Sequence, residues 1–532
     1  MDLGVSDEST AGPTGRGGAQ TVPERFGRNT VTSMALSVVV LVIALLTTPL
    51  LTRHLGHQRY GIWVLVVSIV QYLELLELGF SGATVTAIAR HNAAGDRRSL
   101  ERTVNTTFFT LVPLGFLALL VSIGLAVLLP SLVHVSPSLV SSTRWLVLLL
   151  GLDIVVSIPM DTFGGGLVAI HRFDILNATL IAVAVARAVA WTLVLLFGGG
   201  LVMLGLVTVV IGLCGQLARA VCFARLVPGL KVHPRQFERE VLRSLARPAG
   251  WFAVGGFVTN FRDYARIFLL GVVKSVVTSG IFAVGETLAL LGLKAQAAAT
   301  QQFFPHAAGL VGRREEGALA EATLTGSRIA VATTVPLCLV VAVLARPAIV
   351  SWVGPTYAGA AVGATLLAVA FGLDSLATIP RQVLMGSGNQ RLPALIAVAG
   401  TVFEVLLLLV LGSLYGIAGA GVAAVVSAVA IEVGLTPVVC RRIGVRPFGY
   451  FLRHARAHIL PILCAGAVGW ALSVGPVSTF VAHHHRVAGM GVVAAAGAAV
   501  LVIYGVVFAF SGLNAAERGS VLRRLRLRGS SP

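Results

Sequence analysis

Three charged side chains lie inside an apolar stretch of the sequence. Residues 255–271 read GGFVTNFRDYARIFLLG, so Arg262, Asp263 and Arg266 fall where the chain is otherwise apolar enough to cross a bilayer. Arg262 and Arg266 are four residues apart and share a helical face, and Asp263 lies three residues before Arg266, where it can pair with it. Charges at membrane depth usually pair inside the protein or line a wet cavity. Guanidinium groups bind phosphate in bidentate fashion, so a phosphate-bearing anion is the ligand that these arginines suit.

The composition shows which elements must hold these charges. Of the 532 residues, 56% are hydrophobic and only 12% are charged, and the mean hydropathy is +0.90. A soluble protein of this size needs far more charge on its surface, so the chain is interpreted as a polytopic membrane protein. The net charge of +18 is spread over many short loops and does not gather on one soluble surface, so no nucleic-acid partner is expected.

The apolar runs predict an all-α protein with about fourteen transmembrane helices. The expected spans are 30–52, 60–88, 104–130, 144–170, 175–198, 200–224, 250–272, 277–303, 326–345, 358–380, 392–413, 417–438, 457–474 and 488–511. Most Lys and Arg residues fall in one alternate set of loops, including 225–247 and 441–456. By the positive-inside rule, those loops and both termini are expected on the cytoplasmic side.

An internal repeat divides the helices into two sets. With an offset of 219 residues, YGIWVL at 60–65 aligns with SGIFAV at 279–284, which pairs Gly61 with Gly280. The same offset aligns 87–107 with 306–326. Six helices separate the copies, so the halves run in the same direction, and parallel repeats of this kind usually hold the substrate between them.

The repeat and the spans together predict the domain organisation. The expected parts are a disordered cytoplasmic tail (1–28), an N-lobe of six helices (29–226), an amphipathic cytoplasmic linker (227–249), a C-lobe of six helices (250–440), two further helices (441–511) and a basic cytoplasmic tail (512–532).

Polar residues at equal depth in the two lobes predict a central cavity. Arg262 lies eleven residues after Trp251, or about 16 Å at 1.5 Å per residue, near the midplane. Lys294 falls at similar depth in the next helix, and the offset of 219 places Glu74 and Glu77 opposite it. We therefore expect the cations to bind an anionic headgroup. The residues expected to bind the headgroup through charge or to hydrogen-bond its sugars are Arg262, Arg266, Lys294, Asn260 and Gln296. Those expected to balance charge or couple transport to an ion are Glu74, Glu77 and Asp263.

Buried ion pairing is the competing interpretation of the same charges. Interhelical pairs are the usual fate of charge inside a membrane protein. Asp153, Asp161 and Arg187 are expected to form such a set inside the N-lobe, whereas no partner is predicted for Glu286, Asp374, Glu404 or Glu432.

The absence of several motifs limits the chemistry that the chain is expected to perform. The sequence has no GxxxxGK[ST] motif and no Ser/His/Asp constellation, so it is not expected to be an enzyme. The HHH run at 483–485 lacks further ligands, and neither a metal site nor a cofactor is expected. Secondary transport is the class of function that these absences leave.

Several segments resemble a known family. PLLTRHLG followed by YGIW and LGF, and later SWVGPTYAGAAVGATLLAVAF, GSGNQR and YGIAGAGVAAVVSAVA, resemble bacterial polysaccharide flippases of the multidrug/oligosaccharidyl-lipid/polysaccharide exporter superfamily over roughly residues 28–440. The last two helices resemble the extra pair of the peptidoglycan-precursor flippases, without a matching motif.

The resemblance implies a V-shaped, two-lobe protein of the bacterial plasma membrane that works by alternating access. Such proteins move polyprenyl-diphosphate-linked glycans from the cytoplasmic to the outer leaflet, with membrane lipids and polysaccharide polymerases or glycosyltransferases as further partners. Arg262 and Arg266 fall where relatives often place cavity cations, and Arg59 is a further candidate at the outer mouth. Two alternatives stay open: a cation-coupled drug or metabolite extruder on the same fold, which should have acidic and aromatic cavity walls, and a non-transporting scaffold for glycan enzymes.

Overall fold

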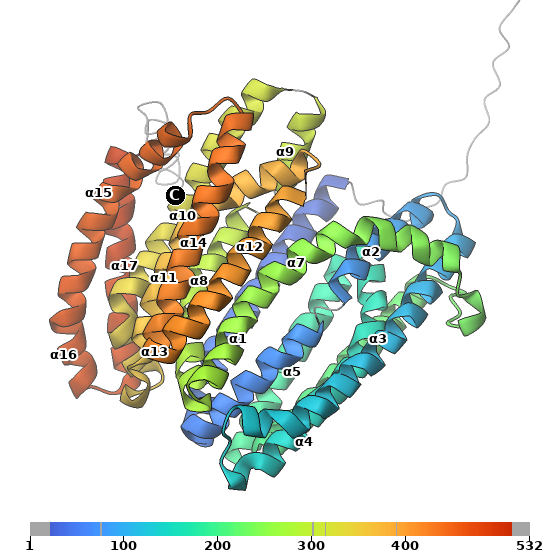
Figure 1. Cartoon of the computed structure of the whole chain (residues 1–532), viewed down its shortest axis with the longest axis horizontal. Helices are drawn as coiled ribbons and strands as arrows, with labels where there is room; N and C mark the ends of the chain where they lie inside the picture. The colour runs from blue at the N-terminus through green and yellow to red at the C-terminus, as the bar shows by residue number, and fades with distance from the viewer. Residues whose placement is uncertain (1–21, 75–76, 301–302, 314, 390, 513–532) are drawn as a thin grey trace, which may run out of the picture.

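A computed structural model describes residues 22–74, 77–300, 303–313, 315–389 and 391–512. Throughout these residues the chain is helical and contains no strand (Figure 1). The helices of the first half are α1 (Val22–Glu74), α2 (Leu78–Ala93), α3 (Arg97–Leu132), α4 (Pro137–Ala169), α5 (Phe173–Leu196), α6 (Leu201–Leu226), η2 (Pro234–Gln236), α7 (Arg239–Val273) and α8 (Val276–Thr300). Those of the second half are α9 (Phe303–Gly312), α10 (Glu316–Trp352), η3 (Pro355–Tyr357), α11 (Ala360–Gly386), α12 (Arg391–Leu407), η4 (Leu408–Gly412), α13 (Ser413–Tyr415), α14 (Ile417–Arg442), α15 (Pro447–Val474), α16 (Pro476–His483) and α17 (Arg486–Ser511).

Long helix α1 covers the first expected span and the start of the second. Its two arms meet at Gly56, whose φ of 70° and ψ of 177° are not helical and reverse the chain. A positive φ strains residues with a Cβ, and glycine adopts it freely. The expected span 60–88 falls on the end of α1, which is described to Glu74, and on most of α2, which is described from Leu78.

Twelve helices of the described chain are long and apolar enough to cross a membrane. The first of them covers both arms of α1, and α7, which carries Arg262, Asp263 and Arg266, is not among them. With the two arms counted separately and α7 included, every expected span has a helical counterpart. The chain is a multi-pass membrane protein.

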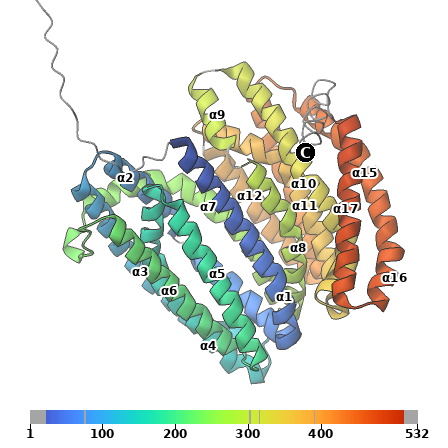
Figure 2. The ribbon, with the colours of Figure 1, turned by 180° about the vertical axis from the view of Figure 1, so that it is seen from behind.

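Two helical groups and an appended pair make up the molecule. Helices α3, α4 and α6 pack together with α5 and the first helix, and α8, α10, α11 and α14 form the second group. Figure 1 shows the first group in blue to green and the second in yellow to orange, and the reverse view in Figure 2 shows α15 and α17 in red along the outer side of α10.

The two groups meet through α1 and α8, where two glycines touch. A Cβ placed on Gly280 would lie 3.0 Å from Cα of Gly61, and one on Gly61 would collide with the backbone of Val276. Trp352 of α10 also links the second group to α1, because its Nε1–H donates to the carbonyl oxygen of Leu45 at 2.7 Å. Gly61 and Gly280 are the pair that the sequence repeat equates, and equivalent residues of two copies meet where a two-fold axis passes between them.

The connector between the halves, residues 227–238, is held to α3. Buried Asn105 donates to the carbonyl oxygen of Lys231 at 2.8 Å and to Oε1 of Gln236 at 2.6 Å, and accepts from the backbone N–H of His233 at 2.7 Å. Arg102 of the same helix pairs with Glu238 at 2.9 Å.

Helices begin inside two of the segments expected at these ends. The linker was expected to run to residue 249, but α7 begins at Arg239. The disordered tail was expected to run to residue 28, but α1 begins at Val22. The rest of that tail, and the basic tail after residue 512, lie outside the described residues.

Candidate functional site

A cavity of about 570 Å³ lies between the two arms of α1, α5, α7 and α8, and so between the two helical groups. Three of the predicted site residues line it: Asn260, Asp263 and Lys294. Two charged residues that the sequence did not single out as site residues complete the lining, Arg187 of α5 and Glu286 of α8. The lining therefore holds two cations and two carboxylates.

Aromatic side chains form the wall of this cavity on the α1 and α5 side. The rings of Trp63 and Trp191 meet edge to face, with centroids 5.3 Å apart and planes at 87°. Trp191 is fixed further because its Nε1–H donates to Oγ1 of Thr208 at 2.9 Å. Tyr60 and Tyr264 also line the space. Aromatic faces held in this way offer flat, apolar surfaces with polar edges.

Hydroxyl and amide groups make up most of the remaining polar lining. They are Thr47, Thr48, Ser68, Gln71, Asn260 and Thr287. Oγ1 of Thr47 donates to the carbonyl oxygen of Ile43 at 2.8 Å, and Oγ1 of Thr287 donates to that of Ala283 at 2.8 Å. Each of these oxygens keeps acceptor capacity for a ligand.

Arg266 does not line the cavity, contrary to the prediction. Its side chain is 3% exposed; Nε donates to Oε1 of Glu404 at 2.6 Å and a terminal nitrogen donates to Oδ1 of Asp263 at 3.2 Å. Glu286 lies 3.8 Å away on α8, and the guanidinium also lies 5.9 Å from the ring centre of Phe371. The predicted pairing of Asp263 with Arg266 is confirmed. Arg266 therefore ties two cavity carboxylates to α12 as part of a buried ion cluster.

Arg262 is also turned away from the central cavity. Its Nε lies 3.9 Å from Oδ1 of Asp263 and 3.9 Å from Oε2 of Glu404, and its side chain is 13% exposed. It borders a separate narrow cleft with Arg381 and Thr401. The helical face shared by Arg262 and Arg266 is turned toward Glu404 of α12, on which α7 packs.

Glu74 and Glu77 do not oppose the C-lobe cations. Glu74 is exposed and lies within electrostatic range of Asp153, Arg187 and Asp161, and neither it nor Glu77 lines the central cavity. Glu77 borders a small cleft with Asp161 inside the N-lobe. Equal depth in the repeat does not fix the direction of a side chain.

The two remaining predicted residues also lie off the cavity. Gln296 is buried, and its Nε2 donates to Oγ1 of Thr378 on α11. Arg59 is exposed on the second arm of α1 and does not line the cavity.

Comparison with known protein families identifies the family of this chain. Residues 26–308 match the family described as polysaccharide biosynthesis protein, which is more than half of the chain. The chain belongs to this family. Among curated proteins, no sequence matches it significantly.

Solved structures show which fold the family member adopts. The chain is similar to the lipid II flippase MurJ in an inward closed conformation, with a TM-score of 0.67 and 10% identity over 90% of this chain and 98% of that one. It is also similar to an inward-facing multidrug resistance MATE transporter of the MOP superfamily, with a TM-score of 0.63 and 16% identity over 76% of this chain and 98% of that one. An outward-facing MATE transporter matches with a TM-score of 0.54 and 16% identity over 79% and 95%. The polysaccharide biosynthesis protein thus has the fold that these solved transporters and the flippase share.

The sequence did not indicate which carboxylates pair with the buried arginines, and these pairs decide which arginine faces the cavity. Glu404 is 138 residues from Arg266 in the chain, and Asp374, also without a predicted partner, accepts from Arg381 at 3.1 Å. The expected set of Asp153, Asp161 and Arg187 divides into two, because Asp161 faces Arg219 of α6 while Asp153 faces Arg187. The sequence feature that could have indicated these pairs is the position of their charged residues inside otherwise apolar helices.

Proposed function

We propose that this transporter flips polyprenyl-diphosphate-linked oligosaccharide from the cytoplasmic to the outer leaflet by alternating access. The observation that carries the proposal is the central cavity. In a member of a polysaccharide biosynthesis family, it combines two cations, aromatic walls and many hydroxyl and amide groups between two helical lobes. A cavity of about 570 Å³ accepts the diphosphate and its nearest sugars, while the polyprenyl chain stays in the bilayer.

Lys294 and Arg187 are the residues proposed to bind the diphosphate. Both line the cavity, from α8 and α5 respectively, so they approach a ligand from the two lobes. Lys294 is exposed to the cavity and makes no ion pair with any described residue, so its ammonium is available for phosphate oxygens. Trp63, Trp191 and the hydroxyl groups around them would pack against and hydrogen-bond the sugars.

Arg266 has a positioning role in this proposal, whereas the sequence predicted that it binds the headgroup. It positions Asp263 and Glu286, the two carboxylates that line the cavity. We propose that these carboxylates couple transport to a cation or balance the charge of Lys294 and Arg187 when no headgroup is bound. Arg262, Arg59, Glu74 and Glu77 lie off the cavity in this conformation, and any role of theirs belongs to another step of the cycle.

Thermal stabilisation of the purified protein by undecaprenyl diphosphate lipids, with and without a sugar, tests the proposal. Wild type should be stabilised, Lys294→Ala should lose most of the shift, and Lys274→Ala should keep it. Lys274 is a matched control because it is exposed just after α7, outside the cavity lining. An equal loss in both variants, or no shift for wild type, would overturn headgroup binding at Lys294.

A cation-coupled extruder is the second candidate, and one observation favours it. The cavity has the acidic and aromatic walls expected for cationic drugs, in Asp263, Glu286 and the tryptophans. The same thermal assay decides: stabilisation by cationic drugs that is lost in Glu286→Gln, with none by the diphosphate lipids, would support the extruder. No stabilisation by either class would favour the scaffold for glycan enzymes.

The cellular setting follows from the proposal. A flippase of this class would lie in the bacterial plasma membrane with both termini in the cytoplasm and would deliver its lipid-linked glycan to polymerases or glycosyltransferases on the outer side. Accessibility of the connector 227–238 to a membrane-impermeant label only after the cells are opened would agree with this orientation, and labelling of intact cells would contradict it.

A further inference from the structure

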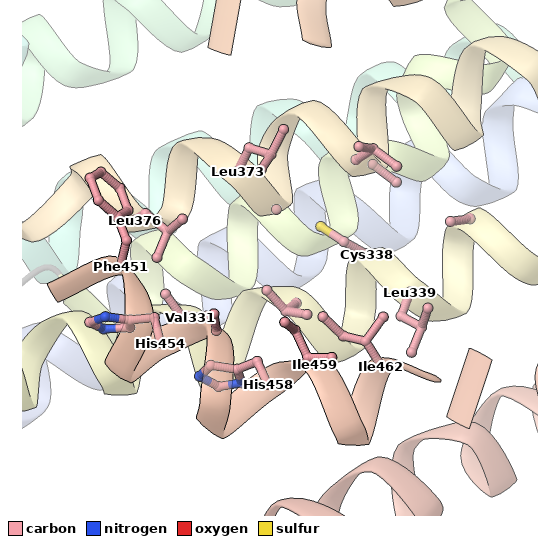
Figure 3. A pocket seen from close by; sticks show the side chains of 16 residues that line it. Val331, Cys338, Leu339, Leu373, Leu376, Phe451, His454, His458, Ile459 and Ile462 are labelled. Atoms are coloured by element: carbon pink, nitrogen blue, oxygen red, sulfur yellow. The ribbon is translucent and has the colours of Figure 1, made fainter. Parts of the chain in front are cut away.

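The second arm of α1, residues 57–74, runs along the central cavity. Its residues that line the cavity are Tyr60, Trp63, Val64, Val67, Ser68 and Gln71. A further cavity of about 460 Å³ lies between α10, α11 and α15, and no residue of α1 lines it (Figure 3). A movement of this arm against the helices that face it would therefore open the central cavity and leave the other one as it is.

Tyr357 bridges the beginning of this arm to the second helical group. It lies in η3, which follows α10 after a turn at Gly354, whose φ of 124° and ψ of 167° are accessible almost only to glycine. The ring of Tyr357 stacks on that of His57, with centroids 4.4 Å apart and planes at 29°, and meets the ring of Tyr60 edge to face at 6.2 Å and 85°. Because Tyr60 also lines the cavity, this bridge adjoins the cavity at the end where α1 reverses.

Tyr72 bridges the other end of the arm to α7. Between ring centroids, it lies 5.0 Å from Phe261, 6.0 Å from Tyr264 and 6.3 Å from Phe268. All three are residues of α7, which packs on α8 and α12. Tyr60 and Tyr72 are twelve residues apart, or about 18 Å along a helix, so the two bridges lie at opposite ends of the stretch that lines the cavity.

The tyrosine hydroxyl at each bridge is buried without a hydrogen bond. The hydroxyl oxygens of Tyr357 and Tyr72 have no hydrogen-bond partner among the described residues, and neither has Nδ1 of His57. Ring contact favours the closed bridge, whereas a buried polar atom without a partner disfavours it. Water would satisfy these atoms once a bridge opened. The two effects oppose each other, so both bridges are suited to be released and formed again in every cycle.

We propose that the second arm of α1 is a gate with one latch at each end: Tyr357 holds the end next to Gly56, and Tyr72 holds the opposite end. Release of the Tyr357 latch would open the cavity to the side of the membrane on which Gly56 lies. Release of the Tyr72 latch would open it to the other side. The proposal rests on the alternating access of the proposed function and names the contacts that alternate, and it requires no particular substrate.

Labelling of Thr287→Cys measures the opening from each side. Thr287 lines the cavity near the middle of α8, and a membrane-impermeant maleimide is applied either to intact cells or to inverted vesicles. Because the native Cys214 is exposed, labelling at position 287 is quantified by peptide mass spectrometry. Tyr357→Ala should speed labelling from the Gly56 side about tenfold, because it loses both ring contacts. Tyr72→Ala should speed labelling from the other side by a similar factor.

Tyr357→Phe separates a latch from a merely structural contact. It keeps both rings in place and removes the hydroxyl that has no partner, so the closed state gains stability. Labelling from the Gly56 side should then become about fivefold slower than in wild type, the opposite of the effect of Tyr357→Ala. The control Tyr415→Ala changes a tyrosine of α13 that is 68% exposed, and it should leave both labelling rates unchanged.

Two results would overturn the latches. One is a labelling rate that is the same in wild type, Tyr357→Ala and Tyr72→Ala. The other is an increase from both sides in either alanine variant, which would indicate a general loosening of the fold. The labelling needs no lipid substrate, so the two proposals can fail separately. Failure of wild type to bind diphosphate lipids would overturn headgroup binding and leave the latches standing, and unchanged labelling with normal lipid binding would do the reverse.

Discussion

Replacing Arg266 and Lys294 by the same residue should have opposite consequences. Arg266 is 3% exposed and has carboxylate oxygens at 2.6, 3.2 and 3.8 Å, from Glu404, Asp263 and Glu286. Lys294 is exposed to the central cavity and has no ion-pair partner among the described residues. Arg266→Met should therefore reduce stability, whereas Lys294→Met should reduce binding of a diphosphate lipid.

The size of the first effect follows from what Arg266→Met leaves behind. Removing one partner of a buried pair costs about 3–5 kcal/mol, because the other charge stays buried without compensation. The variant leaves Glu404, whose side chain is 3% exposed, with Arg262 at 3.9 Å as its remaining cation. It removes the cation beside Glu286, which is 10% exposed, and weakens the compensation of Asp263, which is 31% exposed and can reach water. Most of the loss should thus come from Glu404 and Glu286. Lys294→Met, on an exposed side chain, should change stability by no more than about 0.5 kcal/mol.

Reversible unfolding in mixed micelles, followed by tryptophan fluorescence, measures both variants against wild type. The double variant Arg266→Met with Glu404→Leu should recover part of the stability, because an apolar pair can replace a buried ion pair at little cost. If Arg266→Met were as stable as Lys294→Met and lost diphosphate binding, Arg266 would face the ligand and the ion-cluster interpretation would be refuted.

Three further perturbations test other parts of the structure. Gly280→Leu should force the lobes apart at Gly61, since its Cβ would lie 3.0 Å from that Cα; faster alkylation of a cysteine placed at Ser68 would report the opening, and an unchanged rate would contradict the close approach. Asn105→Ala removes the bonds that hold the connector to α3, so protease cleavage there should rise on the order of tenfold, for a loss of about 1–3 kcal/mol; wild-type resistance would show that the bonds are dispensable. Trp63→Ala should weaken binding of the sugar-bearing lipid more than that of undecaprenyl diphosphate alone, and equal weakening in calorimetry would exclude a sugar-stacking role.

Most of the fold could be predicted because membrane spans are a local property of the sequence. A run of apolar residues long enough to cross the bilayer forms a helix whatever its neighbours are. The repeat added tertiary information: the residues equated by the offset, Gly61 and Gly280, touch in the structure. The start of α7 at Arg239 could not be predicted from hydropathy, because its first turns are rich in charged residues.

The sequence predicted the membrane depth of the site residues but not the direction in which their side chains point. The pairing of Asp263 with Arg266 follows from a spacing of three on a helix, and the structure confirms it. The pairing with Glu404 joins residues 138 apart in sequence, and no local pattern indicates which helix packs on that face of α7. The same limit explains why Arg187 was assigned to the interior of the N-lobe, although it also borders the cavity.

The balance of charge around the cavity bears on how a transporter of the proposed kind could cycle. An empty cavity that carried only cations would resist closing, since like charges brought together in a poorly hydrated space repel strongly. Here Asp263 and Glu286 face the same space as Lys294 and Arg187, and the first two are tethered to buried Arg266. An arriving diphosphate would compete with these carboxylates for Lys294 and Arg187. Binding would then leave negative charge in excess, which a cation taken up by Asp263 or Glu286 would neutralise. On the proposed function, ion coupling thus needs no separate site, because it is a consequence of loading an anion into a cavity that is balanced when empty.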